Sequence, residues 1–132
     1  MKISINEIED WEEFEDLVAA YFREVKNENN IIDVKVEPSG KGSDGGRDIL
    51  VTFEVNDSII TYTRKWVVQC KFYDTAISKT HLATVNIPSL IHEYGADGYL
   101  LVCKNNPAQK VTEMFEDFRK NLPGQYYNAG MA

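Results

Sequence analysis

Gly46-Arg47-Asp48-Ile49-Leu50-Val51 begins one apolar run of this chain, and Val67-Val68-Gln69-Cys70-Lys71 ends the next. Side chains two residues apart on a strand share one face of a sheet, so Gln69 and Lys71 should point the same way. A turn between the two runs predicts a hairpin, in which the start of one strand lies beside the end of the other. We therefore expect Asp48 to lie across from Gln69 and Lys71 if the pairing register allows it.

Hydrophobic periodicity along the chain predicts the element order α-β-β-β-α-β-α. The connection between the third and fourth strands contains a helix, which indicates a crossover between parallel strands. A glycine-rich loop and a short turn join the first three strands, which predicts antiparallel pairing. The expected fold class is therefore α/β, with a mixed central sheet flanked by helices. The expected helices cover 10–26, 78–94 and the segment after Pro107, and the expected strands cover 31–37, 47–55, 64–73 and 99–103.

Prolines and asparagines mark the helix boundaries in this prediction. Pro88 lies inside the second helical segment, where it should break or kink the helix. Pro107 suits the first turn of the last helix, with Asn105 or Asn106 as the N-cap. The length suggests one core, and residues 125–132 show no periodic pattern. We expect a single domain over residues 1–124 and a disordered tail over residues 125–132.

The net charge of the chain is −7, and the charges are unevenly placed. Residues 1–30 hold nine acidic and three basic side chains, whereas residues 35–73 hold six basic and five acidic ones. An acidic chain is a poor free-standing binder of nucleic acid, so such a function would need bridging metal ions, self-association or a partner domain. No apolar run is long enough to span a bilayer. Cys70 and Cys103 lack metal-type spacing, which favours two buried thiols in a reducing cytoplasm over a disulfide or a zinc site.

The polar residues at the strand ends are of the types that metal-assisted phosphodiester hydrolysis requires. Mg²⁺ prefers hard oxygen ligands, which Asp48 offers as a carboxylate, Cys70 as a backbone carbonyl and Gln69 as a weaker amide oxygen. Lys71 can orient or deprotonate the attacking water and offset charge on the phosphate. Glu15, at the border of the apolar face of the first helix, could add a second carboxylate. The alternatives are an ordinary strand-end salt bridge between Asp48 and Lys71, and a solvated edge position for Glu15.

A glycine-rich loop over residues 39–46 precedes Asp48. Such a loop lets the backbone approach a phosphate closely, although this one matches neither the P-loop nor a dinucleotide fingerprint. Arg47 could hold a substrate phosphate or pair with an acid, and Lys41 and Tyr73 are further candidates for binding the substrate. A solvated loop position is an equal alternative for Tyr73.

Four segments in this order resemble the Mrr-like restriction endonucleases of the PD-(D/E)XK nuclease superfamily. The resemblance extends over roughly residues 10–120, and its specificity comes from the combined order and spacing of the segments. The segments are Trp11-x-x-Phe14-Glu15-x-Leu17-Val18, Gly42-x-Asp44-Gly45-Gly46-Arg47-Asp48-Ile49, Val67-Val68-Gln69-Cys70-Lys71 and Ala96-Asp97-Gly98-Tyr99-Leu100-Leu101-Val102.

The resemblance implies a restriction-endonuclease-like core and cleavage of DNA that depends on Mg²⁺, for which Mn²⁺ can substitute. It makes Asp48 a metal ligand, Lys71 the catalytic lysine and Glu15 the helix glutamate that completes the metal site. Gln69 stands where the wider superfamily has an acid, a variant that Mrr-like members share. Such domains often sit at the end of longer proteins, including nucleotide-binding antiphage sensors of bacteria.

The leading hypothesis is therefore a magnesium-dependent endonuclease that cuts duplex DNA with little sequence specificity in bacterial antiphage defence. We expect the chain to be part of a longer protein or to associate with itself, and not to act at a membrane. Two alternatives stay open. One is a structure-selective nuclease similar to a junction resolvase, and the other is a degenerate nuclease fold that only binds DNA or serves assembly.

Overall fold

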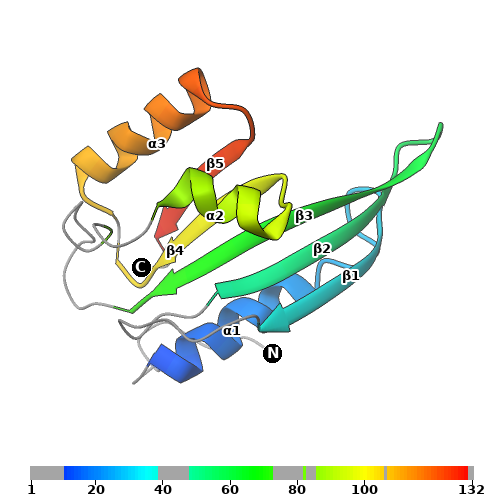
Figure 1. The fold of residues 1–132 in the computed structure, drawn as a ribbon. Helices are drawn as coiled ribbons and strands as arrows, with labels where there is room; N and C mark the ends of the chain where they lie inside the picture. The colour runs from blue at the N-terminus through cyan, green and yellow to red at the C-terminus, as the bar shows by residue number, and fades with distance from the viewer. Residues whose placement is uncertain (1–10, 39–47, 73–81, 83–85, 106, 131–132) are drawn as a thin grey trace.

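A computed structural model of the chain describes residues 11–38, 48–72, 82, 86–105 and 107–130 (Figure 1). None of the helices in these ranges is long and apolar enough to cross a lipid bilayer. The elements in chain order are α1 (Trp11–Arg23), β1 (Ile31–Pro38), β2 (Asp48–Asn56), β3 (Thr61–Lys71), α2 (Ile87–Tyr94), β4 (Gly98–Cys103), α3 (Gln109–Asn121) and β5 (Gln125–Gly130).

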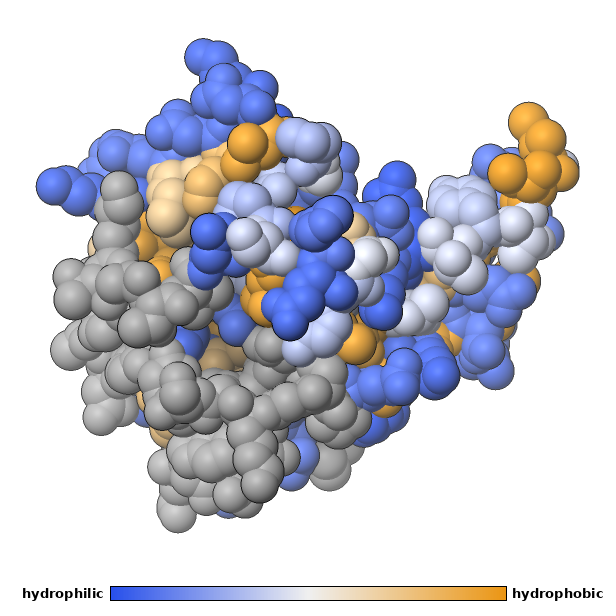
Figure 2. Space-filling model, viewed as in Figure 1, coloured by the Kyte–Doolittle hydropathy of each residue, from blue (hydrophilic) through white to orange (hydrophobic). Residues whose placement is uncertain are grey.

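The strands form one mixed sheet in the order β1-β2-β3-β4-β5. The pairs β1–β2 and β2–β3 are antiparallel, and β4 pairs parallel to β3 across the crossover that contains α2. These findings confirm the predicted α/β class, the antiparallel meander and the parallel crossover. The long β2–β3 hairpin projects beyond the body of the molecule (Figure 1). Its tip is apolar in Figure 2, where Ile59 and Ile60 are 89% and 60% exposed.

The C-terminal segment differs from the prediction. Residues Gln125–Gly130 form β5, which pairs parallel to β4, so the prediction of a disordered tail is wrong for these residues. Tyr126 is buried at 2% exposure, and its carbonyl accepts a hydrogen bond of 2.8 Å from Arg119 of α3. The strand is thus stabilised by tertiary contacts that leave no periodic pattern in its own six residues.

Apolar side chains pack on both faces of the sheet. On β3, Val68 belongs to the cluster under α1, whereas its neighbour Val67 belongs to the cluster under α2 and α3. This alternation follows from the two-residue period of a strand. β4 is buried almost throughout, as the continuous apolar run predicted. The cluster under α1 contains Phe14, Val18, Ile49, Val51, Val68, Cys70 and Val102.

Two helix boundaries also differ from expectation. Pro88 lies in the first turn of α2 rather than within a longer described helix, and a first-turn proline lacks only an N–H that has no helical partner. The side chain of Asn86 caps this helix by accepting a hydrogen bond of 3.1 Å from the N–H of Ser89. α3 begins with Ala108 as its N-cap, so the prediction of Asn105 or Asn106 as the cap is wrong. Residues 78–81 and 83–85 of the second predicted helix lie outside the described ranges.

The close packing of Gly98 gives a test of this fold. A Cβ atom at Gly98 would lie 2.7 Å from Cζ3 of Trp66 and 3.0 Å from the carbonyl oxygen of Gln125. Gly98→Ala should therefore lower the free energy of unfolding by about 1–3 kcal/mol, because the Trp66 ring and the backbone at Gln125 would have to shift. Urea denaturation measures this change.

Gly95→Asn is the matched control. Gly95 ends α2 with a φ of 61° and has space around it, and asparagine tolerates this left-handed conformation. The control should cost less than about 1 kcal/mol. Equal stability of Gly98→Ala and the unaltered protein would contradict the packing of β4 between β3 and β5.

Candidate active site

The register of the β2–β3 hairpin decides how the predicted site residues meet. Asp48, the first residue of β2, lies opposite Gln69 of β3. Residues directly opposite in an antiparallel pair share a face, and Gln69 and Lys71 share a face because they are two apart. The strand positions of all three residues therefore fall on the face that α2 and α3 cover. The side chain of Asp48 lies outside the described part of the structure.

Gln69 is held by a residue that the sequence did not single out. The hydroxyl of Tyr99 on β4 donates a hydrogen bond of 2.5 Å to Oε1 of Gln69. Tyr99 is fully buried, and its ring stacks on Phe115 of α3 with a centroid distance of 5.9 Å. The signal in the sequence was a tyrosine in a buried aliphatic run, because a buried phenol needs a hydrogen-bond partner.

Lys71 is a buried cation at the end of β3. It is 2% exposed and lies beside Cys103 in the parallel register of β3 and β4. Its positive charge acts against the burial that raises the pKa of the Cys103 thiol, which places the ammonium group near that sulfur. A buried charge is costly unless other groups compensate it, and Lys71 takes part in further interactions. This burial distinguishes Lys71 from an ordinary surface lysine.

Glu15 is a buried acid on α1. It is 7% exposed, so the alternative of a solvated edge position is wrong. Burial is the main cause of the raised pKa of the Cys70 thiol, and the charge of Glu15 is the next cause. The carboxylate of Glu15 therefore lies near Cys70 on the α1 face of the sheet, whereas Gln69 and Lys71 belong to the opposite face.

The backbone of β3 brings these two faces together at the strand end. The carbonyl of Lys71 accepts a hydrogen bond of 3.1 Å from the N–H of Lys104, directly after β4. Successive carbonyls of a strand point to alternate sides, so the carbonyl of Cys70 is directed toward β2. Since β2 begins at Asp48, opposite Gln69, this carbonyl oxygen is directed toward the beginning of β2.

The oxygen atoms at this strand end suit a hard divalent cation. Mg²⁺ prefers oxygen ligands. The candidates are the buried carboxylate of Glu15, the backbone carbonyl of Cys70 and the carboxylate of Asp48, which begins β2. Within the described residues, no three side chains of histidine, cysteine, aspartate or glutamate gather into a metal-binding group. The donor set therefore fits the metal only if the carboxylate of Asp48 completes it.

The structure brings together only part of the predicted set. Asp48, Gln69 and Lys71 lie at one end of the β2–β3 hairpin, whereas Glu15 lies near Cys70 on the other face of the sheet. The candidates for binding substrate lie outside the described residues; they are Lys41, Arg47 and Tyr73.

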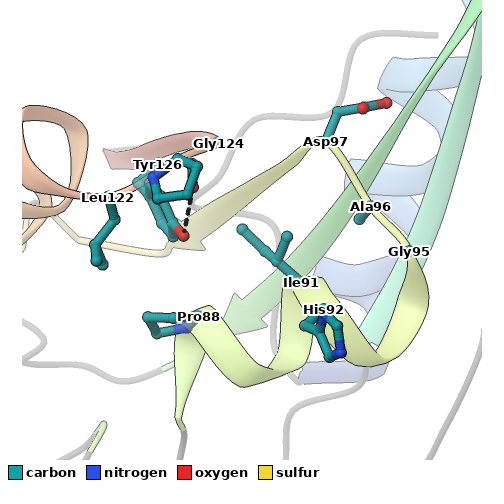
Figure 3. Close-up of a pocket in the computed structure, with 10 residues that line it drawn as sticks. Pro88, Ile91, His92, Gly95, Ala96, Asp97, Leu122, Gly124 and Tyr126 are labelled. Atoms are coloured by element: carbon teal, nitrogen blue, oxygen red, sulfur yellow. Dashed lines mark hydrogen bonds between the residues drawn. The ribbon is translucent and has the colours of Figure 1, made fainter.

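A separate pocket lies between the end of α2 and the connection from α3 to β5 (Figure 3). Its volume is about 550 Å³, and His92, Asp97 and Tyr126 are among its lining residues. The hydroxyl of Tyr126 donates a hydrogen bond of 3.0 Å to the carbonyl of Pro123, and the carboxylate of Asp97 accepts one from the N–H of Lys65. None of the predicted site residues lines this pocket.

Comparison with known proteins identifies the class to which this arrangement belongs. The Mrr_cat family, described as restriction endonuclease, matches residues 6–121. The match includes Glu15, Asp48, Gln69 and Lys71 and covers most of the chain, so the chain belongs to this family of restriction endonucleases.

One solved structure of similar fold is the DNA modification-dependent restriction endonuclease AspBHI. The two folds superpose with a TM-score of 0.60 at 16% sequence identity over 87% of this chain. The chain spans 28% of the length of AspBHI. This likeness confirms the restriction-endonuclease-like fold. A search of curated proteins finds no match to the chain.

The burial of the two cysteines yields a prediction that does not depend on catalysis. Cys70 packs under α1 and Cys103 packs under α2 and α3; both are free thiols, so the disulfide alternative is wrong. Burial raises the pKa of both thiols, that of Cys103 from 9.0 to about 12. At pH 8 the folded protein should not react with a thiol-specific disulfide reagent, while the unfolded chain should react at both cysteines.

The same shift has a consequence for stability at alkaline pH. The thiol of Cys103 has a higher pKa in the folded state than in the unfolded chain. The contribution of the neutral thiol to the free energy of unfolding is therefore complete below pH 9 and is lost as the pH rises from about 9 toward 12.

In the experiment with the disulfide reagent, a folded protein that reacts as fast as the unfolded chain would contradict the buried positions of both sulfur atoms.

Proposed function

We propose that the chain is a divalent-metal-dependent endonuclease that hydrolyses phosphodiester bonds of duplex DNA at the start of β2 and the end of β3. The observation that carries this proposal is the register that pairs Asp48 with Gln69, two residues before the buried Lys71. The polar residues Gln69 and Lys71 alternate with the buried residues Val68 and Cys70, so apolar packing alone does not account for them.

The proposed metal ligands are the carboxylates of Asp48 and Glu15 and the backbone carbonyl of Cys70. The cation is Mg²⁺, which Mn²⁺ can replace. When bound, the cation would polarise the scissile phosphate and lower the pKa of a water molecule. Burial of Glu15 supports this assignment, because a carboxylate removed from water gains most from a neighbouring positive charge. Gln69 was predicted to give a further oxygen, and that oxygen accepts a hydrogen bond from Tyr99.

Lys71 supplies the positive charge of the chain itself in this proposal. As an ammonium group it orients the attacking water and offsets the charge that builds on the phosphate, and as a neutral amine it can accept a proton from that water. The ammonium group is almost completely removed from solvent, where such an interaction is stronger than in water. Arg47, Lys41 and Tyr73 are proposed to contact the phosphates of the substrate backbone.

The proposed setting is antiphage defence in the bacterial cytoplasm, with little sequence specificity in this chain. The net charge of −7 supports weak binding of DNA by the isolated chain. Further domains of a longer protein, or a second copy of the chain, would then supply the remaining affinity for DNA. The family of restriction endonucleases supports this reading over a junction resolvase or a degenerate DNA-binding fold.

Substitution of the two central residues tests the proposal. Asp48→Asn and Lys71→Met should each reduce nicking of a supercoiled plasmid in Mg²⁺ by about 10²–10⁴-fold, because they remove a metal ligand and the only proposed proton-transfer group. Chelation with EDTA should abolish the activity of the unaltered protein. Circular dichroism should confirm that both variants fold.

Lys65→Met is the matched control, since Lys65 lies on the same strand but at the level of Asp97, far from Asp48 in the register. It should nick DNA at the rate of the unaltered protein. Undiminished nicking by Asp48→Asn and Lys71→Met together would remove these residues from the active site. Absence of any metal-dependent cleavage of DNA would favour the degenerate fold.

A further inference from the structure

We propose that Tyr99 is a positioning residue that sets the direction of the Gln69 side chain, so that Gln69 offers a hydrogen-bond donor to the active site instead of an oxygen to the metal. This inference rests on the proposed nuclease function and deepens it. It assigns a role to Tyr99 that neither the sequence pattern nor the family match supplies.

The position of the Tyr99 hydroxyl is fixed by packing. The side chain is fully buried, and its ring is nearly parallel to that of Phe115, with an angle of 18° between the planes. Phe115 is itself fully buried and contacts Phe118 edge-on. A side chain held on all sides keeps one rotamer, so the hydroxyl of Tyr99 approaches Gln69 from one direction only.

The hydrogen bond fixes which end of the amide faces the core. Tyr99 donates to Oε1 of Gln69 at 2.5 Å. A phenol is a better donor than acceptor and an amide oxygen is a better acceptor than a phenol oxygen, so this direction is favoured over the reversed amide. The oxygen and the nitrogen of a planar amide are separate branches of one carbon atom, so we infer that Nε2 is turned away from the Tyr99 hydroxyl. In this inference the donor group of the half-buried Gln69 faces away from the core.

A donor at this position has a different chemical use from a ligand oxygen. An N–H group cannot coordinate a cation, but it can donate to a carboxylate or to a phosphate oxygen that carries negative charge. Gln69 lies opposite Asp48 and two residues before Lys71, so both groups belong to the place where the phosphate would bind. The metal would then be held by Asp48, Glu15 and the Cys70 carbonyl, without Gln69.

Three variants separate these two roles. Tyr99→Phe removes the hydroxyl and keeps the ring on Phe115. Tyr126→Phe is the matched control, because Tyr126 is also buried and its hydroxyl donates to the carbonyl of Pro123, outside the site. Gln69→Glu keeps one oxygen for Tyr99 and brings a second, charged oxygen to the metal.

The measurements are binding of Mn²⁺ by electron paramagnetic resonance and single-turnover nicking of plasmid DNA at saturating Mn²⁺. Tyr99→Phe should nick about tenfold more slowly, as expected from the loss of one orienting hydrogen bond, and should keep the Mn²⁺ affinity within about twofold. Gln69→Glu should bind Mn²⁺ about tenfold more tightly, because a carboxylate is a stronger ligand than an amide. Tyr126→Phe should change neither quantity.

A nuclear magnetic resonance spectrum of the protein without metal tests the orientation of the Gln69 side-chain amide. The ¹⁵N–¹H signals of the Gln69 amide, assigned by their absence in Gln69→Glu, should shift in Tyr99→Phe and stay in place in Tyr126→Phe. The positioning role is overturned if these signals stay in place in Tyr99→Phe, or if Tyr99→Phe nicks as fast as the unaltered protein. It is also overturned if Tyr126→Phe slows nicking equally.

A separate result would contradict the proposed donor role of Gln69. If Oε1 of Gln69 ligates the metal, the hydrogen bond from Tyr99 orients that oxygen and draws electron density from it, so Tyr99→Phe should change the Mn²⁺ affinity by more than about threefold. That result would overturn the inference and leave the nuclease function intact. An unaltered protein that neither binds Mn²⁺ nor nicks DNA would overturn the proposed function, and this inference with it.

Discussion

The register of the β2–β3 hairpin is the constraint on which the candidate site depends. A shift of one residue would move Val68 and Cys70 from the α1 cluster to the opposite face. The same shift would take Asp48 out of alignment with Gln69. β3 has buried residues on both faces, and β2 has buried residues under α1 and the partly buried Leu50 on the other face, so such a slip would expose apolar surface on each side. The cores under α1 and under α2 and α3 thus fix the geometry of the polar group at the strand end.

The two buried charged residues are the unusual feature of an otherwise apolar interior. Among the described residues, only Glu15 and Lys71 are both charged and buried. They approach the end of β3 from opposite faces, with Cys70 directed toward Glu15 and Gln69 directed toward Tyr99. Burial of an acid and a base is a weak source of stability. The proposed metal-dependent site gives both residues a chemical role at the strand end where Asp48 begins β2.

Much of this arrangement could be predicted from the sequence because it follows from strand periodicity. Alternation placed Gln69 and Lys71 on one face, and the continuous apolar run of β4 predicted burial on both faces. β5 could not be predicted, because its only buried residue is Tyr126 and its partners are β4 and Arg119 of α3. The family match ends at residue 121, so this strand extends the sheet beyond the matched region. The contact of Tyr99 could not be predicted either, because its hydroxyl on β4 donates to Gln69 on the neighbouring strand β3.

The central claim is that Asp48 and Lys71 serve one metal-dependent site together with the Cys70 carbonyl. A crystal structure of the protein with Mn²⁺, in which anomalous scattering locates the ion, tests this claim most directly. We expect one anomalous peak in contact with the Asp48 carboxylate and the Cys70 carbonyl oxygen, with the Lys71 ammonium group turned toward the same pocket. An ion bound elsewhere, or Asp48 and Lys71 on opposite faces of the sheet, would contradict it.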